Sequence, residues 1–214
     1  MSVKDFMAAE LVTVDPQTKI FDAVDLMKKH DIHRLPVVKA DKLVGLITEG
    51  TIQEALPSTT TSLSVYETNY LLNKTVVADV MIEKVATIDP DAQLEDAIYK
   101  MRQKNVNVLP VLKDDQLVGI ITNNDIFDAF LKITGYHEGG SRIQIAVKED
   151  RKGLLAEVAK VLADHDYDIL TVIIDHAKTG TVMEFQISSK DAEAISQVLT
   201  DAGFNVQRAV VTNP

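Results

Sequence analysis

The sequence has no cysteine, which excludes disulfides, thiolate metal sites and a cysteine nucleophile. It also lacks tryptophan and has only 5% aromatic residues, so it offers few stacking surfaces. The net charge is −10 and no run of Lys or Arg occurs, so nucleic acid and anionic membranes are not expected partners. No apolar run is long enough to span a bilayer, and residues 1–5 lack the apolar stretch of a secretion signal. We therefore expect a cytoplasmic protein.

A repeat organises the first two thirds of the 214 residues. When the sequence is shifted by 74 positions, residues 3–56 align with residues 77–130 without a gap, and 21 of the 54 pairs are identical. The chain therefore contains a duplicated unit. The composition, 46% hydrophobic and 25% charged, is ordinary for a soluble globular protein.

Both copies predict the same elements. After an Asp-Pro turn, apolar residues recur at helical spacing; two short apolar runs then flank a polar turn, and a short helix ends near Leu56 or Leu131. One copy is predicted to be strand, helix, hairpin and helix. We expect the two copies to pack strand to strand as a pseudo-twofold pair, because one alone is too small to bury its apolar face. The predicted boundaries are 1–56 and 77–131 for the copies, 57–76 for a connector in which 63–72 is helical, and 132–141 for a linker.

Residues 142–214 follow a different pattern. Four short strand signals and two helical signals alternate in the order βαββαβ, which is the ferredoxin-like arrangement. The predicted fold class of the whole chain is therefore α+β. The strands are expected near 142–147, 169–174, 182–187 and 206–211, and the helices near 154–162 and 195–199.

The repeat resembles the CBS domain, and the pair resembles a Bateman module, a common sensor of adenosyl ligands. The residues that carry the resemblance are Leu-Pro-Val-Val at 35–38, Gly-Leu-Ile-Thr at 45–48 and Gly-Ile-Ile-Thr-Asn-Asn-Asp at 119–125. The last segment resembles an ACT domain through Glu-Asp-Arg-Lys-Gly-Leu-Leu at 149–155 and Tyr-Asp-Ile at 167–169. The domain order and length are similar to those of the acetoin utilization protein B family.

The CBS resemblance implies a nucleotide site at Thr122 and Asp125. In this family the Asp carboxylate accepts hydrogen bonds from both ribose hydroxyls and the Thr hydroxyl binds a phosphate, at a helix N-terminus whose dipole favours anions. Thr-x-x-Asp is also close to a capping box, which stabilises a helix without any ligand, and the two roles are compatible. The first copy has Thr51 at the Asp position and therefore lacks the ribose carboxylate.

The first copy instead carries His33 and Arg34, where the second has Asn107 and Val108. The resemblance implies that such a pair meets phosphates, and a guanidinium is a fixed, permanently charged fork suited to them. The alternative is a solvated surface pair. We expect one principal site, with the ribose on Asp125, the phosphate on Thr122, Arg34 and His33, and the adenine among apolar strand residues. The residues expected around the adenine are Val85, Thr87, Val108 and Pro110.

The ACT resemblance implies amino-acid binding at the loop after the first strand of the last segment, at Asp150, Gly153 and Leu154. A glycine there lets a ligand approach the backbone. The position before it, often Pro in the family, is Lys152. The alternative is that Gly153 only turns the chain into a helix and that the domain only dimerises.

No constellation of catalytic residues is evident. The five histidines are scattered, and no His-Glu-x-x-His, Walker or Gly-x-Ser-x-Gly motif occurs, so we expect no enzyme, no metal and no required cofactor. The expected function is a regulatory sensor of AMP, ADP or ATP that forms a homodimer. The alternatives are cyclic di-AMP or S-adenosylmethionine as the ligand, or a regulatory subunit that binds a partner enzyme of acetoin or related carbon metabolism.

Overall fold

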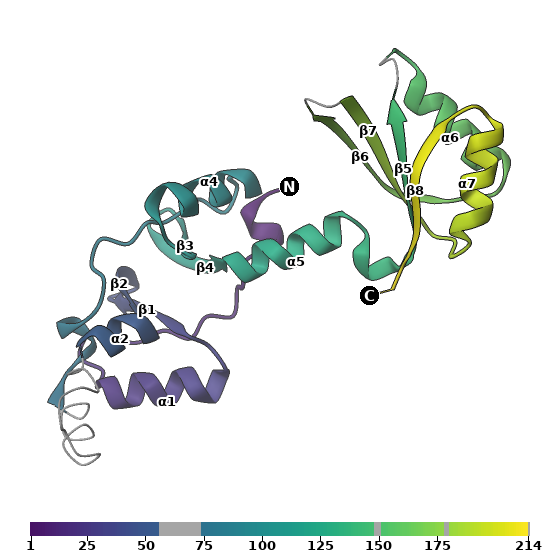
Figure 1. Ribbon diagram of the computed structural model, residues 1–214. Coiled ribbons are helices and arrows are strands. Elements are labelled where there is room, and N and C mark those ends of the chain that lie inside the picture. Colours follow the sequence, from purple (N-terminus) through teal and green to yellow (C-terminus); the bar gives the residue numbers. More distant parts are fainter. Residues whose placement is uncertain (56–73, 148–150, 178–179, 214) are drawn as a thin grey trace. The chain divides into compact units, whose positions relative to one another are not determined.

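The computed structural model describes residues 1–55, 74–147, 151–177 and 180–213, in two compact units, Met1–Ile126 and Phe127–Pro214. Each unit is described by itself (Figure 1). Most of the predicted connector, including the helix expected at 63–72, lies outside the described residues. Among those that are described, no helix is both long and apolar enough to cross a membrane.

The two copies form matching elements, as the repeat predicts. The helix that opens each copy buries the apolar residues at i, i+3 and i+7, namely Ile20, Ala23 and Met27 in the first copy. The residue that follows this helix, Asp31 in the first copy and Asn105 in the second, has φ of 53°, a left-handed conformation common after a helix. The elements are α1 Ile20–His30, β1 Arg34–Lys39, β2 Lys42–Thr48 and α2 Glu49–Ala55, then α4 Leu94–Lys104, β3 Val108–Lys113, β4 Gln116–Thr122 and α5 Asn123–Ile133.

The predicted hairpins are confirmed, and each has a two-residue turn. Ala40 and Asp41 have φ of 48° and 61°, and Asp114 and Asp115 have φ of 50° and 64°. Positive φ at both central residues is the turn that matches the twist of antiparallel strands. The two hairpins join through β2 and β4 into one sheet of order β1-β2-β4-β3, so the copies do pack strand to strand.

The segment before the first helix of each copy packs against the other copy. Val3 N–H donates to Ala92 O at 2.9 Å, and Val77 N–H donates to Thr18 O at 2.9 Å. Both valines are fully buried. The two copies are therefore interlocked, and neither completes its own core.

The strand expected before the first helix of each copy is reduced to a single parallel bridge. Val14 N–H donates to Pro36 O at 3.1 Å, and Val14 O accepts from Val38 N–H at 2.9 Å; Ile88 bridges Val111 in the same way. The ladder stops there because the Asp-Pro turn follows at once, and Pro16 has no N–H to continue it.

The second unit has the predicted βαββαβ order. Its sheet is antiparallel with the strand order β6-β7-β5-β8, and α6 and α7 cover one face (Figure 1). The core lies between this face and the helices; Ile143, Phe185, Leu162 and Leu199 are fully buried there. The elements are β5 Gly140–Val147, α6 Leu154–Asp164, β6 Ile169–Ala177, β7 Gly180–Ile187, α7 Ala192–Asp201 and β8 Asn205–Thr212.

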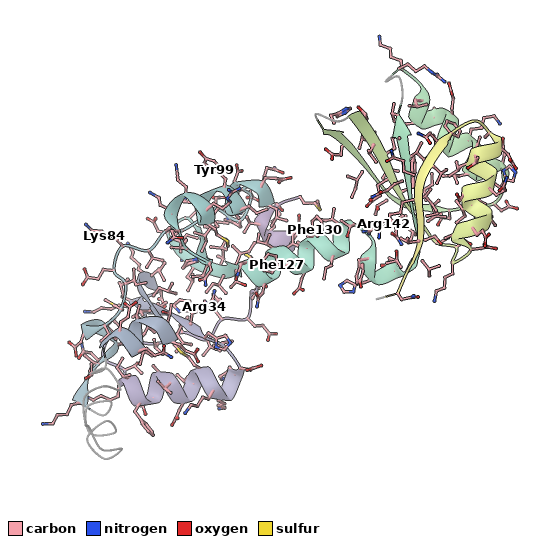
Figure 2. All side chains as sticks on the ribbon, viewed as in Figure 1. Arg34, Lys84, Tyr99, Phe127, Phe130 and Arg142 are labelled. Atoms are coloured by element: carbon pink, nitrogen blue, oxygen red, sulfur yellow. The ribbon has the colours of Figure 1, made fainter. Side chains whose placement is uncertain are left out.

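The segment expected as a linker, 132–141, is bonded to the sheet of the second unit. Arg142 Nη2 and Thr171 Oγ1 donate to Thr134 O at 3.2 and 3.3 Å, and Gln186 Nε2 donates to Gly139 O at 2.5 Å. Arg142 is labelled in Figure 2, and its Nε donates to Gln186 Oε1 at 3.1 Å. The segment includes the end of α5, a 3₁₀ turn at Tyr136–Glu138 and the start of β5.

Candidate functional site

The start of α5 is closed by a reciprocal cap between Thr122 and Asp125. Asp125 Oδ2 accepts from Thr122 N–H at 2.7 Å and from Thr122 Oγ1 at 2.8 Å, while Asp125 N–H donates to Thr122 Oγ1 at 3.4 Å. This is the capping box that the sequence offered as an alternative to ligand binding. Both side chains are half-buried, and the contacts engage only one of the two carboxylate oxygens.

The first copy closes α2 with hydroxyls alone. Thr48 N–H donates to Thr51 Oγ1 at 3.0 Å, and Thr51 N–H donates to Thr48 Oγ1 at 3.1 Å. Both copies therefore have the cap, but only the second has a carboxylate in it. Comparing the two copies separates the effect of the cap on helix stability from the effect of the negative charge.

Arg34 reaches from the first copy into the second. Its Nη1 donates to Asn107 O at 3.1 Å and lies 3.5 Å from Asn107 Oδ1. Burial lowers the pKa of the Arg34 guanidinium, and the negative charge of Asp125 acts in the opposite direction. The side chain therefore lies in the electrostatic neighbourhood of Asp125, is partly desolvated, and remains protonated at neutral pH. Arg34 is labelled in Figure 2.

Asn107 is a contact residue that the sequence did not indicate as part of the site. Its carbonyl accepts from Arg34 and also from Asn123 N–H at 3.1 Å, so it links the guanidinium to the first residue of α5. The available signal was its position, since Asn107 occupies in the second copy the place of His33 in the first.

His33 is directed toward a different partner. Its Nδ1 lies 3.1 Å from Glu49 Oε2, and both side chains are more than half exposed. The pair lies at the start of α2, where Glu49 N–H also donates to His33 O at 3.1 Å. The described contacts therefore join Arg34, but not His33, to the surroundings of Asp125.

Of the four residues expected around an adenine, two lie in β3 and two lie in the segment that leads into Ile88. Val108 and Pro110 are buried, and Val108 is the cross-strand partner of Thr122. The extended segment that contains Val85 and Thr87 leads into Ile88, which bridges Val111, and both residues are half-buried. Apolar strand residues thus adjoin the capped start of α5.

The predicted amino-acid site is described only in part. Asp150 lies outside the described residues. Gly153 precedes α6 with φ of +90°, and a Cβ at this position would meet nothing within 4 Å, so its backbone conformation rather than crowding favours glycine. Leu154 packs against the core. A neighbouring cavity of about 270 Å³ is lined by Leu154, Arg151, Glu157 and the loop at 202–205.

Residues 3–58 and 77–132 each match the family model of the CBS domain. The chain belongs to the CBS domain family. The first unit, with its interlocked copies and the capped start of α5, is a tandem CBS pair. The match ends at residue 132 and does not include the βαββαβ unit.

Known proteins similar to the chain share this CBS pair. The CBS domain-containing protein YhcV of Bacillus subtilis (strain 168) is 34% identical over 125 residues, which cover 58% of this chain and 82% of that protein. A solved structure from Vibrio cholerae, described as an acetoin utilization protein (AcuB), has 28% identity and a TM-score of 0.54, and the match covers 64% of this chain and 96% of that one.

A third similar protein was solved with adenosyl compounds bound. The CBS domain pair of protein MJ0100, in complex with 5′-methylthioadenosine and S-adenosyl-L-methionine, has 30% identity and a TM-score of 0.51. The match covers 61% of this chain and 95% of that one. CBS pairs related to this one therefore include a protein that binds adenosyl ligands.

Proposed function

We propose that this chain is a non-catalytic regulatory sensor whose CBS pair binds an adenine nucleotide, AMP, ADP or ATP, at the start of α5. One observation carries the proposal: the Arg34 guanidinium donates to Asn107 O, which also accepts from Asn123 N–H at the start of α5, two residues before Asp125. A cation suited to phosphate and a carboxylate suited to ribose, one from each CBS repeat, thus occupy a common neighbourhood.

The ribose is assigned to Asp125. A carboxylate has about four lone-pair sites, and Thr122 uses two of them, both on Oδ2, which leaves Oδ1 to accept from ribose hydroxyls. The cap therefore supports ribose binding, because it holds the carboxylate in place before the ligand arrives.

The phosphate is assigned chiefly to Arg34. The Thr122 hydroxyl has a single proton and already donates it to Asp125, so it can donate to a phosphate only by giving up that bond. A phosphate near Arg34 would complement a partly desolvated cation and the positive end of α5. His33, which is paired with Glu49, is assigned a smaller role in phosphate binding. The adenine is assigned to the surface of β3 at Val108 and Pro110.

The experiment is calorimetric titration of the purified full chain with ATP, ADP, AMP and adenosine. Asp125→Asn keeps an acceptor for the cap but removes the charge, and we expect it to weaken AMP binding roughly tenfold to a hundredfold, the range of a charge-assisted hydrogen bond. The same substitution should not change the affinity for 2′,3′-dideoxy-AMP, which lacks both hydroxyls. Equal losses for the two ligands would contradict the ribose assignment.

The phosphate assignment has a separate test. We expect Arg34→Gln to weaken binding of ATP and ADP but leave binding of adenosine unchanged. The matched control is Lys28→Gln on α1, which removes an exposed positive charge elsewhere in the same repeat and should leave every affinity unchanged. If wild-type protein binds none of the four ligands, the nucleotide proposal fails.

S-adenosylmethionine is the second candidate ligand, favoured by the adenosyl complex of MJ0100. Its ribose has both hydroxyls free, whereas cyclic di-AMP presents only one of the two to Asp125. S-adenosylmethionine has a single carboxylate in place of the phosphates, so Arg34→Gln should weaken its binding less than the binding of ATP. 5′-Methylthioadenosine, which has no anionic group, should bind wild type and Arg34→Gln equally. These responses separate the two adenosyl compounds from the nucleotides.

We infer that the βαββαβ unit is an ACT-like domain with one of two roles. It either binds an amino acid near Gly153 and Leu154 and combines that signal with the signal of the CBS pair, or it serves only in assembly. A thermal-shift screen with the twenty amino acids tests the first role.

The alternative function for the whole chain, a regulatory subunit of a metabolic enzyme, is favoured by the likeness of the CBS pair to AcuB. It predicts that the full chain retains a partner enzyme from lysate in a nucleotide-dependent manner.

A further inference from the structure

The sheet of the second unit has a polar face that α6 and α7 leave uncovered. Successive side chains of a strand point to opposite faces, and Ile143 and Phe185 point into the core beneath the helices. Their neighbours Arg142, Gln144 and Glu184 therefore lie on the open face (Figure 2). These three residues are only half exposed, so they line a depression rather than a flat surface.

A cavity of about 400 Å³ opens on this face. The residues that line it include Tyr136, Arg142, Gln144, Glu184, Arg208 and Val210. It shares no lining residue with the cavity at Leu154, where an amino acid was expected. Cavities of this size hold small organic molecules. The βαββαβ unit thus has a second, separate cavity that could hold a ligand.

The carboxylate in this cavity is already paired. Glu184 Oε2 accepts from Gln144 Nε2 at 2.5 Å, and Glu184 Oε1 lies 3.4 Å from Arg142 Nε. Arg142 is fixed in turn by Thr134 O, to which its Nη2 donates at 3.2 Å. The Arg142 and Glu184 side chains are only 27% and 22% exposed. The two charges therefore neutralise each other and form a fixed wall of the cavity.

Arg208 adds a positive charge that this pair does not neutralise. It is the cross-strand partner of Gln144, and such partners lie side by side on one face of a sheet. Among the residues that the structure describes, the Arg208 guanidinium has no ion-pair partner. The cavity thus has two guanidinium groups and one carboxylate, in a protein whose net charge is −10. A local excess of positive charge favours an anionic ligand.

We propose that this cavity binds a small organic monocarboxylate, with its carboxylate on Arg208 and its apolar part against Val210 and the ring of Tyr136. A guanidinium presents a planar fork that matches a carboxylate. One excess positive charge suits a monoanion, whereas the nearby Glu184 carboxylate would repel the second charge of a phosphate dianion. The proposal goes beyond nucleotide sensing and does not depend on it.

Hexanoate is the probe, with hexanamide and inorganic phosphate as comparison ligands. Hexanoate has one carboxylate and an apolar chain, hexanamide has the chain without the charge, and phosphate has charge without the chain. In ligand-observed NMR titrations of the full chain, we expect hexanoate to bind more tightly than either comparison ligand, on the order of tenfold.

Two substitutions should change this affinity in opposite directions. Arg208→Gln should weaken hexanoate binding on the order of tenfold, because it removes the partner of the carboxylate. Glu184→Gln should tighten it roughly threefold, because it removes a repulsive charge and keeps an acceptor for Gln144. The matched control is Lys160→Gln on α6, which removes an exposed positive charge on the helix-covered side of the sheet and should leave the affinity unchanged.

The CBS pair is excluded as the binding site if Arg34→Gln leaves hexanoate binding unchanged, as we expect. Arg208 is exposed, so Arg208→Gln should fold normally, and circular dichroism verifies this for each variant. Wild type that does not bind hexanoate, or that binds hexanamide or phosphate as tightly, would overturn the proposal. So would equal losses in Arg208→Gln and Lys160→Gln, a loss in Arg34→Gln, or weaker binding by a folded Glu184→Gln variant.

Discussion

Asp125 Oδ2 accepts hydrogen bonds from both the N–H and the hydroxyl of Thr122, at 2.7 and 2.8 Å. The carboxylate that we assign to the ribose is therefore also the residue that closes the first turn of α5. A substitution at this position changes helix stability as well as ligand affinity, and the two effects have to be separated.

The first prediction separates them by comparing the two repeats. Asp125→Ala removes the cap of α5, and Thr51→Ala removes the equivalent cap of α2. We expect each to lower the free energy of unfolding by about 1 kcal/mol in urea titrations, the usual contribution of a helix cap. Only Asp125→Ala should weaken nucleotide binding. A similar loss of affinity in Thr51→Ala would show that the effect arises from folding rather than from a lost contact.

The second prediction concerns Arg34, whose guanidinium is partly desolvated. Arg34→Val copies the residue of the second repeat, Val108, and removes the cost of burying a charge. Asn107 O is not orphaned, because Asn123 N–H still donates to it at 3.1 Å. We expect the variant to be more stable by about 0.5–1 kcal/mol in urea unfolding and to bind ATP more weakly, the usual trade-off at a functional site. A less stable variant would contradict this account.

Local patterns in the sequence predicted the helices and hairpins because both depend on periodicity and turn residues. They could not predict that the segment at Val3 packs on the second copy and the segment at Val77 on the first. The two segments are nearly equivalent in sequence, and either could pack on its own copy. The contact between Arg34 and Asn107 was missed for a related reason. It joins two repeats, and the pseudo-twofold geometry that brings the residues together is not a local property of either segment.

The resemblance to CBS domains indicated Thr122 and Asp125 before any geometry was known, and the same tetrapeptide predicted the cap that the structure has. The tetrapeptide could not predict that the Thr122 hydroxyl donates to Asp125, because a hydroxyl proton can be directed to several acceptors.

In the second unit, the βαββαβ order could be predicted from the alternation of strand and helix patterns. The hydrogen bonds that join residues 134–139 to the sheet could not be predicted, because they depend on Arg142 and Gln186, which are distant from one another in sequence.

The third prediction tests the packing of the N-terminal segment on the second repeat. Lys4 Nζ lies 2.6 Å from Asp91 Oδ1, and its hydrogen bond and charge, together with Lys113, lower the pKa of the Asp91 carboxyl. A carboxyl whose pKa is lower in the folded state stabilises the fold above its unfolded pKa, about 3.9. This contribution is lost as the pH falls through the lower folded value.

We therefore expect Asp91→Asn to lower the urea midpoint at pH 7 and low salt, and the difference from wild type to shrink below about pH 4. The effect should be small and should decrease with added salt, because both side chains are exposed. Asp25→Asn, on the exposed face of α1, is the control for the loss of a surface carboxylate and should leave the urea midpoint at pH 7 unchanged. A difference that stays constant from pH 7 to pH 3 would exclude the ion pair as its cause.

The last prediction concerns two equivalent glycines in the sheet of the CBS pair. A Cβ at Gly45 would lie 2.5 Å from the sulfur of Met81, and a Cβ at Gly119 would lie 2.3 Å from the sulfur of Met7. Overpacking of this kind costs about 1–3 kcal/mol, and a flexible methionine side chain that can move aside lowers the cost. We therefore expect Gly45→Ala and Gly119→Ala each to lower the free energy of unfolding within that range, as measured by urea unfolding.

Double variants identify the contact that causes the strain. Met81→Ala should relieve much of the loss in Gly45→Ala, and Met7→Ala should do the same for Gly119→Ala, because each removes the sulfur that the new Cβ would meet. The crossed combinations, Met7→Ala with Gly45→Ala and Met81→Ala with Gly119→Ala, are the controls and should give additive losses. Additive losses in the matched pairs as well would show that the methionine contacts are not the source of the strain.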